Sequence, residues 1–270
     1  KGRQSQTSTV LAPGPFSRVV AVGLGKPEDL HARTAEEAGG RAAAALLREE
    51  WATLDAGRLP PELAAAAAMG AVLRAWRFDR YRTKEKPEDK PRLARLSVLT
   101  PDPAAAEAAW GKLAPVARGV FLTRELVSEP ANILTPAEMA RRCEALSTLG
   151  LEVEVFGPDR LRDLGFGALL GVAQGSANEP RMVVLRWPGK SGPGARLQEP
   201  LAFIGKGVTF DTGGISIKPA AGMEDMKWDM AGAGAVAGLM AALAGRRARV
   251  DAVGVLGLVG NMPSGTAQRP

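Results

Sequence analysis

Two segments near the C-terminal end, residues 201–205 (LAFIG) and 250–259 (VDAVGVLGLV), are apolar without the polar–apolar alternation of a half-exposed strand. Such runs are typical of strands that are buried on both faces of a sheet because helices cover both sides. Between them lie a glycine-rich loop, residues 205–226, and an apolar helix expected from about Asp229 to Leu243. The order strand, helix, strand predicts an α/β fold.

The rest of the chain also alternates between short strands and helices. At about 150 residues per domain, 270 residues suggest two domains, with a boundary near residues 116–130. Thr34 with Glu37, and Thr135 with Glu138, form capping boxes that predict helix starts. The expected strands are 18–23, 93–99, 151–156 and 181–187, and the expected helices are 34–58, 62–76, 104–128 (interrupted at Gly111 and Pro115), 136–149 and 158–164.

The sequence contains one histidine, His31, and one cysteine, Cys143. Zinc sites of the Cys/His type need three or four such ligands, so this chain cannot form one. A disulfide framework and a two-cysteine redox centre are excluded for the same reason. Any metal or acid–base chemistry must therefore use Asp, Glu and Lys. We interpret His31 as an ordinary surface residue and Cys143 as a buried small hydrophobe.

The compartment suggested by the sequence is the cytoplasm. A single cysteine allows no intrachain disulfide, and the first ten residues, KGRQSQTSTV, contain no apolar signal segment. The longest apolar run, Met230 to Gly245, is shorter than the roughly 20 residues needed to cross a bilayer, so we expect no membrane contact. The chain begins at Lys1 rather than Met and stops soon after the turn-rich stretch 261–265. We expect a piece of a longer protein.

The glycine-rich loop concentrates charged side chains at the end of an apolar strand, where open α/β sheets place their ligands. Its charged residues are Lys206, Asp211, Lys218, Glu224, Asp225, Lys227 and Asp229. Carboxylates suit hard divalent metals, and a lysine joins them as a ligand only when its amine is neutral. Charged loop ends are common, so composition alone favours solvated charges and salt bridges over a metal site.

The segment GKGVTFDTGGISIKP, residues 205–219, closely resembles the hallmark of the leucyl (cytosol) aminopeptidase family of dinuclear metallopeptidases. The similarity continues through MEDMKWDMAGAGAV and NMPSG, and upstream through SEPANILTP and WRFDRY. The resemblance implies an N-terminal α/β, macro-like domain over residues 1–116, a connecting helix and linker over 117–130, and a zinc-peptidase-like catalytic domain over 131–270. It implies a mixed, mostly parallel central sheet in the catalytic domain, with both domains incomplete.

The resemblance also assigns roles to residues. Lys206, Asp211 and Asp229 match ligands of two divalent ions, Mn²⁺ or Zn²⁺ with Mg²⁺ possible, and Asp211 is expected to bridge both. Lys218 matches the catalytic lysine that polarises the scissile carbonyl, and Met226 matches a residue that lines the pocket for the first side chain of the substrate. Lys218 and Asp211 also count as substrate-binding. The implied protein is a homohexamer that releases N-terminal residues, leucine above all, from peptides.

Two departures from the family pattern matter. The second acidic motif, of the form Asn-Thr-Asp-Ala-Glu-Gly-Arg, is absent from these 270 residues, and Gly260 stands where related sequences usually have Glu. That motif supplies further metal ligands and an arginine beside the carbonyl. We therefore expect the 270-residue chain alone to have no appreciable peptidase activity.

The alternative interpretation is a non-catalytic DNA-binding or assembly protein of the same fold. Residues 74–95 interleave arginines and lysines with Trp76, Phe78 and Tyr81, a pattern that suits phosphate contact and base stacking. Acidic residues and prolines dilute this stretch, which favours an ordinary solvated surface. Steep salt dependence of binding to duplex DNA would support the alternative.

Overall fold

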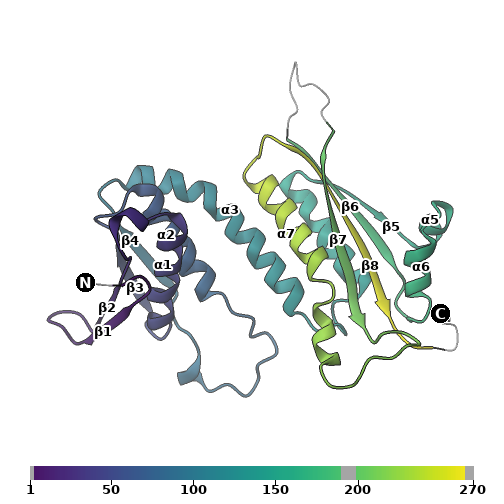
Figure 1. Cartoon of the computed structure of the whole chain (residues 1–270), viewed down its shortest axis with the longest axis horizontal. Helices are drawn as coiled ribbons and strands as arrows, with labels where there is room; N and C mark the ends of the chain where they lie inside the picture. The colour runs from purple at the N-terminus through teal and green to yellow at the C-terminus, as the bar shows by residue number, and fades with distance from the viewer. Residues whose placement is uncertain (1–2, 190–198, 265–270) are drawn as a thin grey trace. The chain divides into compact units, whose positions relative to one another are not determined.

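The structure, a computed structural model, describes residues 3–189 and 199–264, and it divides into two compact units, residues 1–117 and 118–270 (Figure 1). Helix α3 (Pro103–Ser128) passes from the first unit into the second. The sequence predicted interruptions at Gly111 and Pro115, and this was wrong, because α3 runs through both residues. Packing of its buried side chains, Ala117 and Leu126 among them, holds the helix in spite of the missing proline N–H.

The first unit consists of two helices packed closely together and two small two-stranded sheets (Figure 1). A methyl group at Gly39 would collide with the Ala67 carbonyl, and one at Gly70 with the Glu36 carbonyl, so the two helix backbones touch. In the two sheets of this unit, β1 pairs antiparallel with β2, and β3 pairs parallel with β4. The elements are β1 (Thr7–Leu11), β2 (Arg18–Val22), α1 (Ala32–Leu46), β3 (Trp51–Asp55), α2 (Pro61–Ala75) and β4 (Arg95–Leu99), with 3-10 turns η1 (Pro27–Asp29) and η2 (Pro87–Asp89).

The start and end of α1 correct two predictions. The helix begins at Ala32, and its N-cap is His31, whose Nδ1 accepts a hydrogen bond from the Thr34 N–H at 3.3 Å. His31 is therefore a capping residue rather than a surface residue without a role, and Thr34 lies inside the helix. The helix ends at Leu46 instead of continuing to 58, because the next residues pair with β4 to form β3. Strand pairing over 44 residues of separation is not visible in local sequence.

The second unit contains a four-stranded sheet in the order β5-β6-β8-β7. The sheet is mixed, as predicted, but within the described residues the parallel pairing is confined to β7 and β8, while β5–β6 and β6–β8 are antiparallel. Helices α5, α6 and α7 accompany it (Figure 1), together with α4 and the 3-10 turns η3 and η4. The bounds are α4 (Pro136–Glu144), η3 (Ala145–Leu149), β5 (Glu152–Phe156), α5 (Pro158–Asp163), α6 (Gly167–Ala173), β6 (Arg181–Pro188), β7 (Leu201–Asp211), η4 (Met223–Trp228), α7 (Ala231–Gly245) and β8 (Asp251–Asn261).

Helices cover both faces of this sheet. Because side chains alternate along a strand, Gly254 and Gly257 of β8 face opposite sides. A Cβ at Gly254 would meet Val236 and Met240 of α7, and one at Gly257 would meet Leu169 of α6. The main core lies between the sheet and α4 and α7, with Leu185 and Leu256 among its fully buried side chains.

One helical stretch, Met223–Gly245, is long and apolar enough to cross a membrane by length and composition alone. Half of its most apolar window is buried inside the structure, and Ala233, Ala237 and Met240 of α7 are fully buried in the core. A mostly buried core helix passes the same test, so the stretch is weak evidence for a span.

The start of α4 matches the predicted capping box and carries a network of ion pairs. Thr135 Oγ1 accepts from the Glu138 N–H at 3.2 Å. Glu138 pairs with Arg141 at 2.7 Å and with Arg142 at 2.8 Å, and Arg142 also reaches the buried carboxylate of Glu129 at 2.8 Å. The hydrogen bonds from Arg141 and Arg142 lower the pKa of Glu138 to about 2.

This pKa predicts a pH-dependent contribution of Glu138 to stability. The folded-state pKa lies below the unfolded value, so the contribution is complete above about pH 4.5 and is lost as the pH falls toward 2. The free energies of unfolding of wild type and Glu138→Gln, measured with urea, should therefore differ most at neutral pH and converge toward pH 2. Asp159→Asn, which removes an exposed pair with Arg162, should change little at any pH. A Glu138→Gln difference that stays constant down to pH 2 would contradict the prediction.

Candidate metal centre

Strand β7 carries two of the predicted site residues, because it extends six residues beyond the predicted end at Gly205 and reaches Asp211. Lys206 and Asp211 lie five positions apart and would face opposite sides of a regular strand. The register with β8 shifts between Val208 and Phe210, which inserts one extra residue into β7. This bulge returns Lys206 and Asp211 to the same face.

The Asp211 carboxylate is held by three donors. Oδ1 accepts from the Gly213 N–H at 2.8 Å and from Asn261 Nδ2 at 2.6 Å, and Oδ2 accepts from Lys218 Nζ at 2.7 Å. Gly213 and Gly214 have φ values of 89° and 71°, which turn the chain sharply after the strand. Burial raises the pKa of Asp211, but the hydrogen bonds from Lys218, Gly213 and Asn261 outweigh it, so the pKa lies below its ordinary value.

A second carboxylate–lysine pair is formed by Lys206 and Asp229. Lys206 Nζ lies 2.5 Å from Asp229 Oδ1, and the Asp229 side chain is only 17% exposed. Asp229 follows η4 and precedes α7, so the packing of α7 on β7 sets its position. The other oxygen, Asp229 Oδ2, is buried and has no hydrogen-bond partner.

These residues fit a divalent cation. A buried carboxylate oxygen without a partner is costly, and a cation beside it removes that cost. Carboxylates with a lysine amine form an oxygen-rich donor set suited to Mn²⁺, Mg²⁺ or Zn²⁺. Among residues 3–189 and 199–264, no group of three His, Cys, Asp or Glu side chains could hold a metal. Asp211 and Asp229, each paired with a lysine, are therefore at most part of a metal-ligand set within these residues.

Lys218 and Met226 lie together beside Asp211. Lys218 Nζ is 3.1 Å from Met226 Sδ, and its backbone N–H donates to the Thr212 carbonyl at 2.8 Å, which folds the loop back over the end of β7. The structure thus brings Asp211, Lys218 and Met226 into one cluster. The neighbouring Glu224 and Asp225 are exposed in the first turn of η4, where the Asp225 N–H donates to the Gly222 carbonyl at 3.2 Å.

Asn261 is the site residue that sequence reasoning missed. It ends β8 directly opposite Asp211, and Thr212 donates to its carbonyl from both N and Oγ1 at 2.9 Å. The prediction placed residues 261–265 in a turn after the strand, whereas β8 continues through Asn261. The available signal was the NMPSG match, which indicated resemblance but assigned no role.

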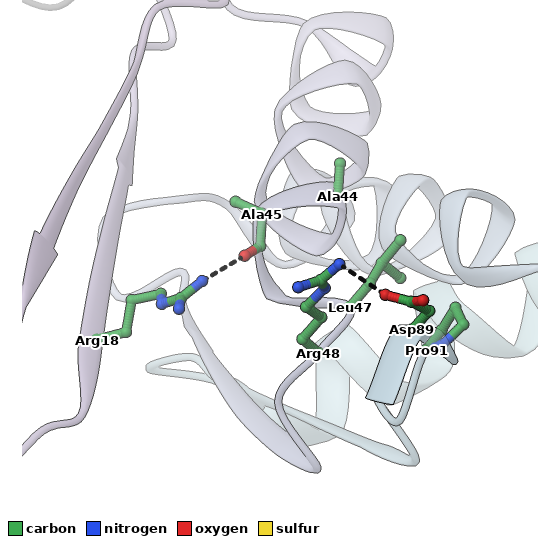
Figure 2. A pocket seen from close by; sticks show the side chains of 7 residues that line it. All are labelled: Arg18, Ala44, Ala45, Leu47, Arg48, Asp89 and Pro91. Carbon is green, nitrogen blue, oxygen red and sulfur yellow. Dashed lines mark hydrogen bonds and ion pairs between the residues drawn. The ribbon is translucent and has the colours of Figure 1, made fainter. Parts of the chain in front are cut away.

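A cavity of about 330 Å³ lies elsewhere, in the first unit (Figure 2). Its charged groups are already paired: Arg18 donates to the Ala45 carbonyl at 3.2 Å, and Arg48 lies 3.7 Å from Asp89. Arg18 thereby satisfies a carbonyl at the end of α1. These pairings indicate a structural role for the cavity lining.

Two other predictions concern groups outside the metal centre. Cys143 is buried, and burial raises the pKa of its thiol to about 12, so it is the inert core residue that was expected. In the basic segment 74–95, Arg77 pairs with Asp79 and with Glu85. DNA binding by this segment stays a prediction.

The fold and site define an α/β protein with two carboxylate–lysine pairs near the end of one strand, Lys206 with Asp229 and Lys218 with Asp211. The chain belongs to the cytosol aminopeptidase family: the model of the family's catalytic domain matches residues 121–270, and that of its N-terminal domain matches residues 1–85. It is 50% identical to proteins named probable cytosol aminopeptidase from Caulobacter vibrioides (over 277 residues) and Afipia carboxidovorans (over 280 residues). Each comparison covers 100% of this chain and 55% of the relative. The chain therefore spans about half the length of these relatives.

Two solved structures are also similar to this chain. The bottromycin maturation enzyme BotP in complex with Mn has a TM-score of 0.83 at 34% identity, covering 99% of this chain and 56% of its own. A tomato leucine aminopeptidase mutant has a TM-score of 0.83 at 30% identity, covering 100% of this chain and 52% of its own. The α/β fold predicted from the sequence is thereby confirmed.

Proposed function

We propose that this chain supplies the N-terminal domain and the first half of the metal site of an aminopeptidase that releases N-terminal residues from peptides, with a leucine-type preference. The observation that carries the proposal is the pair of carboxylate–lysine contacts, Asp211 with Lys218 and Asp229 with Lys206, beside the buried free oxygen of Asp229. Membership in the cytosol aminopeptidase family supports the reaction class.

Lys206, Asp211 and Asp229 would hold the metal ions. When bound, such ions would supply an activated water molecule and a Lewis acid for the scissile carbonyl. The related structure of BotP in complex with Mn supports Mn²⁺, and Zn²⁺ and Mg²⁺ suit the same ligands.

Lys218 provides a positive charge beside this centre. Its side chain is 35% exposed, and Asp211 and Met226 fix its Nζ from two sides. A fixed ammonium stabilises the negative charge that develops on the carbonyl oxygen as the tetrahedral species forms, without having to reorganise during the reaction. Met226, in contact with Lys218, would line the pocket for the first side chain of the substrate, where its flexible thioether accommodates apolar shapes.

The test compares the 270-residue chain with a full-length version that carries the C-terminal remainder of its relatives. With Mn²⁺ and a leucine chromogenic amide, the full-length protein should turn over the substrate, and chelation followed by Mn²⁺ should abolish and restore the activity. The 270-residue chain should show no appreciable turnover, because it lacks the second acidic motif, which would supply further metal ligands. An N-acetylated substrate, which lacks the free amine, serves as the matched control and should not be cleaved. Turnover by the short chain near that of the long one would contradict the division of the site.

The family name of the curated relatives supports the cytoplasm as the compartment. A homohexamer is the assembly that the resemblance implies for the full-length protein, and light scattering after size-exclusion chromatography measures it directly.

A further inference from the structure

The side chain of Asn261 contacts the centre of the proposed metal site. It lies at the end of β8, opposite Asp211 in the register, and its amide Nδ2 donates to Asp211 Oδ1 at 2.6 Å. The contact joins residues 50 positions apart in the sequence. The Gly213 N–H donates a second hydrogen bond to the same oxygen, Asp211 Oδ1.

This side-chain contact is not needed to close the ends of the two strands. The backbone carbonyl of Asn261 already accepts from the Thr212 N–H and from Thr212 Oγ1, both at 2.9 Å. These two bonds fasten β8 to the first residue after β7. The amide of Asn261 is therefore an additional contact directed at the carboxylate.

The loop also leaves room for this amide. A Cβ atom at Gly214 would lie 2.7 Å from Asn261 Oδ1, closer than real Cβ contacts, and the φ of Gly214 is +71°. A glycine at 214 therefore permits both the turn and the orientation in which Nδ2 points at Asp211.

We propose that Asn261 is a positioning residue of the metal site, whose amide fixes the plane of the Asp211 carboxylate; the inference rests on the proposed function. Oδ1 has two acceptor positions, and the Gly213 N–H and the Asn261 amide occupy both. Oδ2 is consequently the oxygen that faces a cation, which in this structure is the Lys218 ammonium. A neutral donor suits this place, because an acidic side chain there would repel Asp211.

The test replaces Asn261 by leucine, which has a similar size and no donor, in the full-length protein. Partners that orient metal ligands typically contribute about 10- to 100-fold in metal affinity. Asn261→Leu should therefore bind Mn²⁺ about 10- to 100-fold more weakly, measured from free Mn²⁺ by electron paramagnetic resonance. At saturating Mn²⁺, kcat for the leucine amide should fall while KM stays within about twofold of wild type.

Two further variants separate positioning from folding. Thr209→Val removes a different side-chain bond between the same strands, Thr209 Oγ1 to the Val259 carbonyl at 3.2 Å, and should leave Mn²⁺ affinity unchanged. Gly214→Ala displaces the amide from the opposite side and should weaken Mn²⁺ binding as Asn261→Leu does.

Wild-type Mn²⁺ affinity in Asn261→Leu would overturn the inference and leave the proposed function standing, provided that the wild type is active. Equal losses of Mn²⁺ affinity in Asn261→Leu and Thr209→Val would also overturn the inference, because they would indicate a general effect on the strand ends. A wild-type protein that neither binds Mn²⁺ nor hydrolyses the substrate would overturn the proposed function and the inference together.

Discussion

Replacing Lys218 by methionine in the full-length protein should lower kcat for leucine amide hydrolysis by about 10²- to 10³-fold. Methionine keeps the length of the side chain and its contact with Met226 but removes the charge. A preorganised donor acts on the charge that develops in the transition state, so its loss falls on kcat far more than on KM. The fixed position of Nζ, 2.7 Å from Asp211 and 3.1 Å from Met226, is what makes the ammonium preorganised.

The matched control is Lys227→Met, which removes a lysine of the same loop region. Lys227 Nζ lies over the Trp228 ring, 5.6 Å from its centroid, and contacts none of the site residues among the described interactions. Its kcat should stay within about twofold of wild type. Mn²⁺ titration of Lys218→Met separates the loss of charge stabilisation from a loss of metal. A kcat near that of wild type in Lys218→Met, with Mn²⁺ bound, would exclude the proposed role of this lysine.

Local patterns predicted a large part of the second unit. Apolar runs indicated β7 and β8, and Thr135 with Pro136 marked the start of α4, because strand burial and helix capping act over a few residues. The family motif indicated Lys206, Asp211, Lys218, Met226 and Asp229 as one site. The structure adds which residues pair, Lys206 with Asp229 and Lys218 with Asp211.

The features that sequence did not predict depend on contacts between distant segments. The bulge in β7 exists only relative to the register of β8, so no local pattern indicates that Lys206 and Asp211 share a face. The same holds for β3, which was assigned to a helix because its partner β4 begins 44 residues later. Asn261 belongs to this group, because its importance comes from a residue 50 positions away.

Gly205→Ala should destabilise the second unit by about 3 kcal/mol, at the upper part of the usual range for overpacking. A Cβ at Gly205 would lie 2.6 Å from Ala233 Cα and 2.8 Å from both the Ala233 nitrogen and the Gly232 carbonyl oxygen. These are backbone atoms in the first turn of α7, so no side-chain rotation relieves the collision. The helix must move away from β7, and this movement separates Asp229, which precedes α7, from Lys206, which follows Gly205.

Urea unfolding of the chain measures the loss, and Gly167→Ala is the matched control. A Cβ at Gly167, the first residue of α6, would meet nothing within 4 Å, so the free energy of unfolding of Gly167→Ala should differ from wild type by less than about 0.5 kcal/mol.

The double variant Gly205→Ala/Ala233→Gly distinguishes a backbone collision from a side-chain collision. Removing the Ala233 methyl leaves the backbone contact in place, so stability should not recover. Recovery would mean that side-chain packing, rather than the approach of the two backbones, limits residue 205. A Gly205→Ala variant as stable as wild type would show that α7 can shift on β7 without cost, and the position of Asp229 beside Lys206 would then need another explanation.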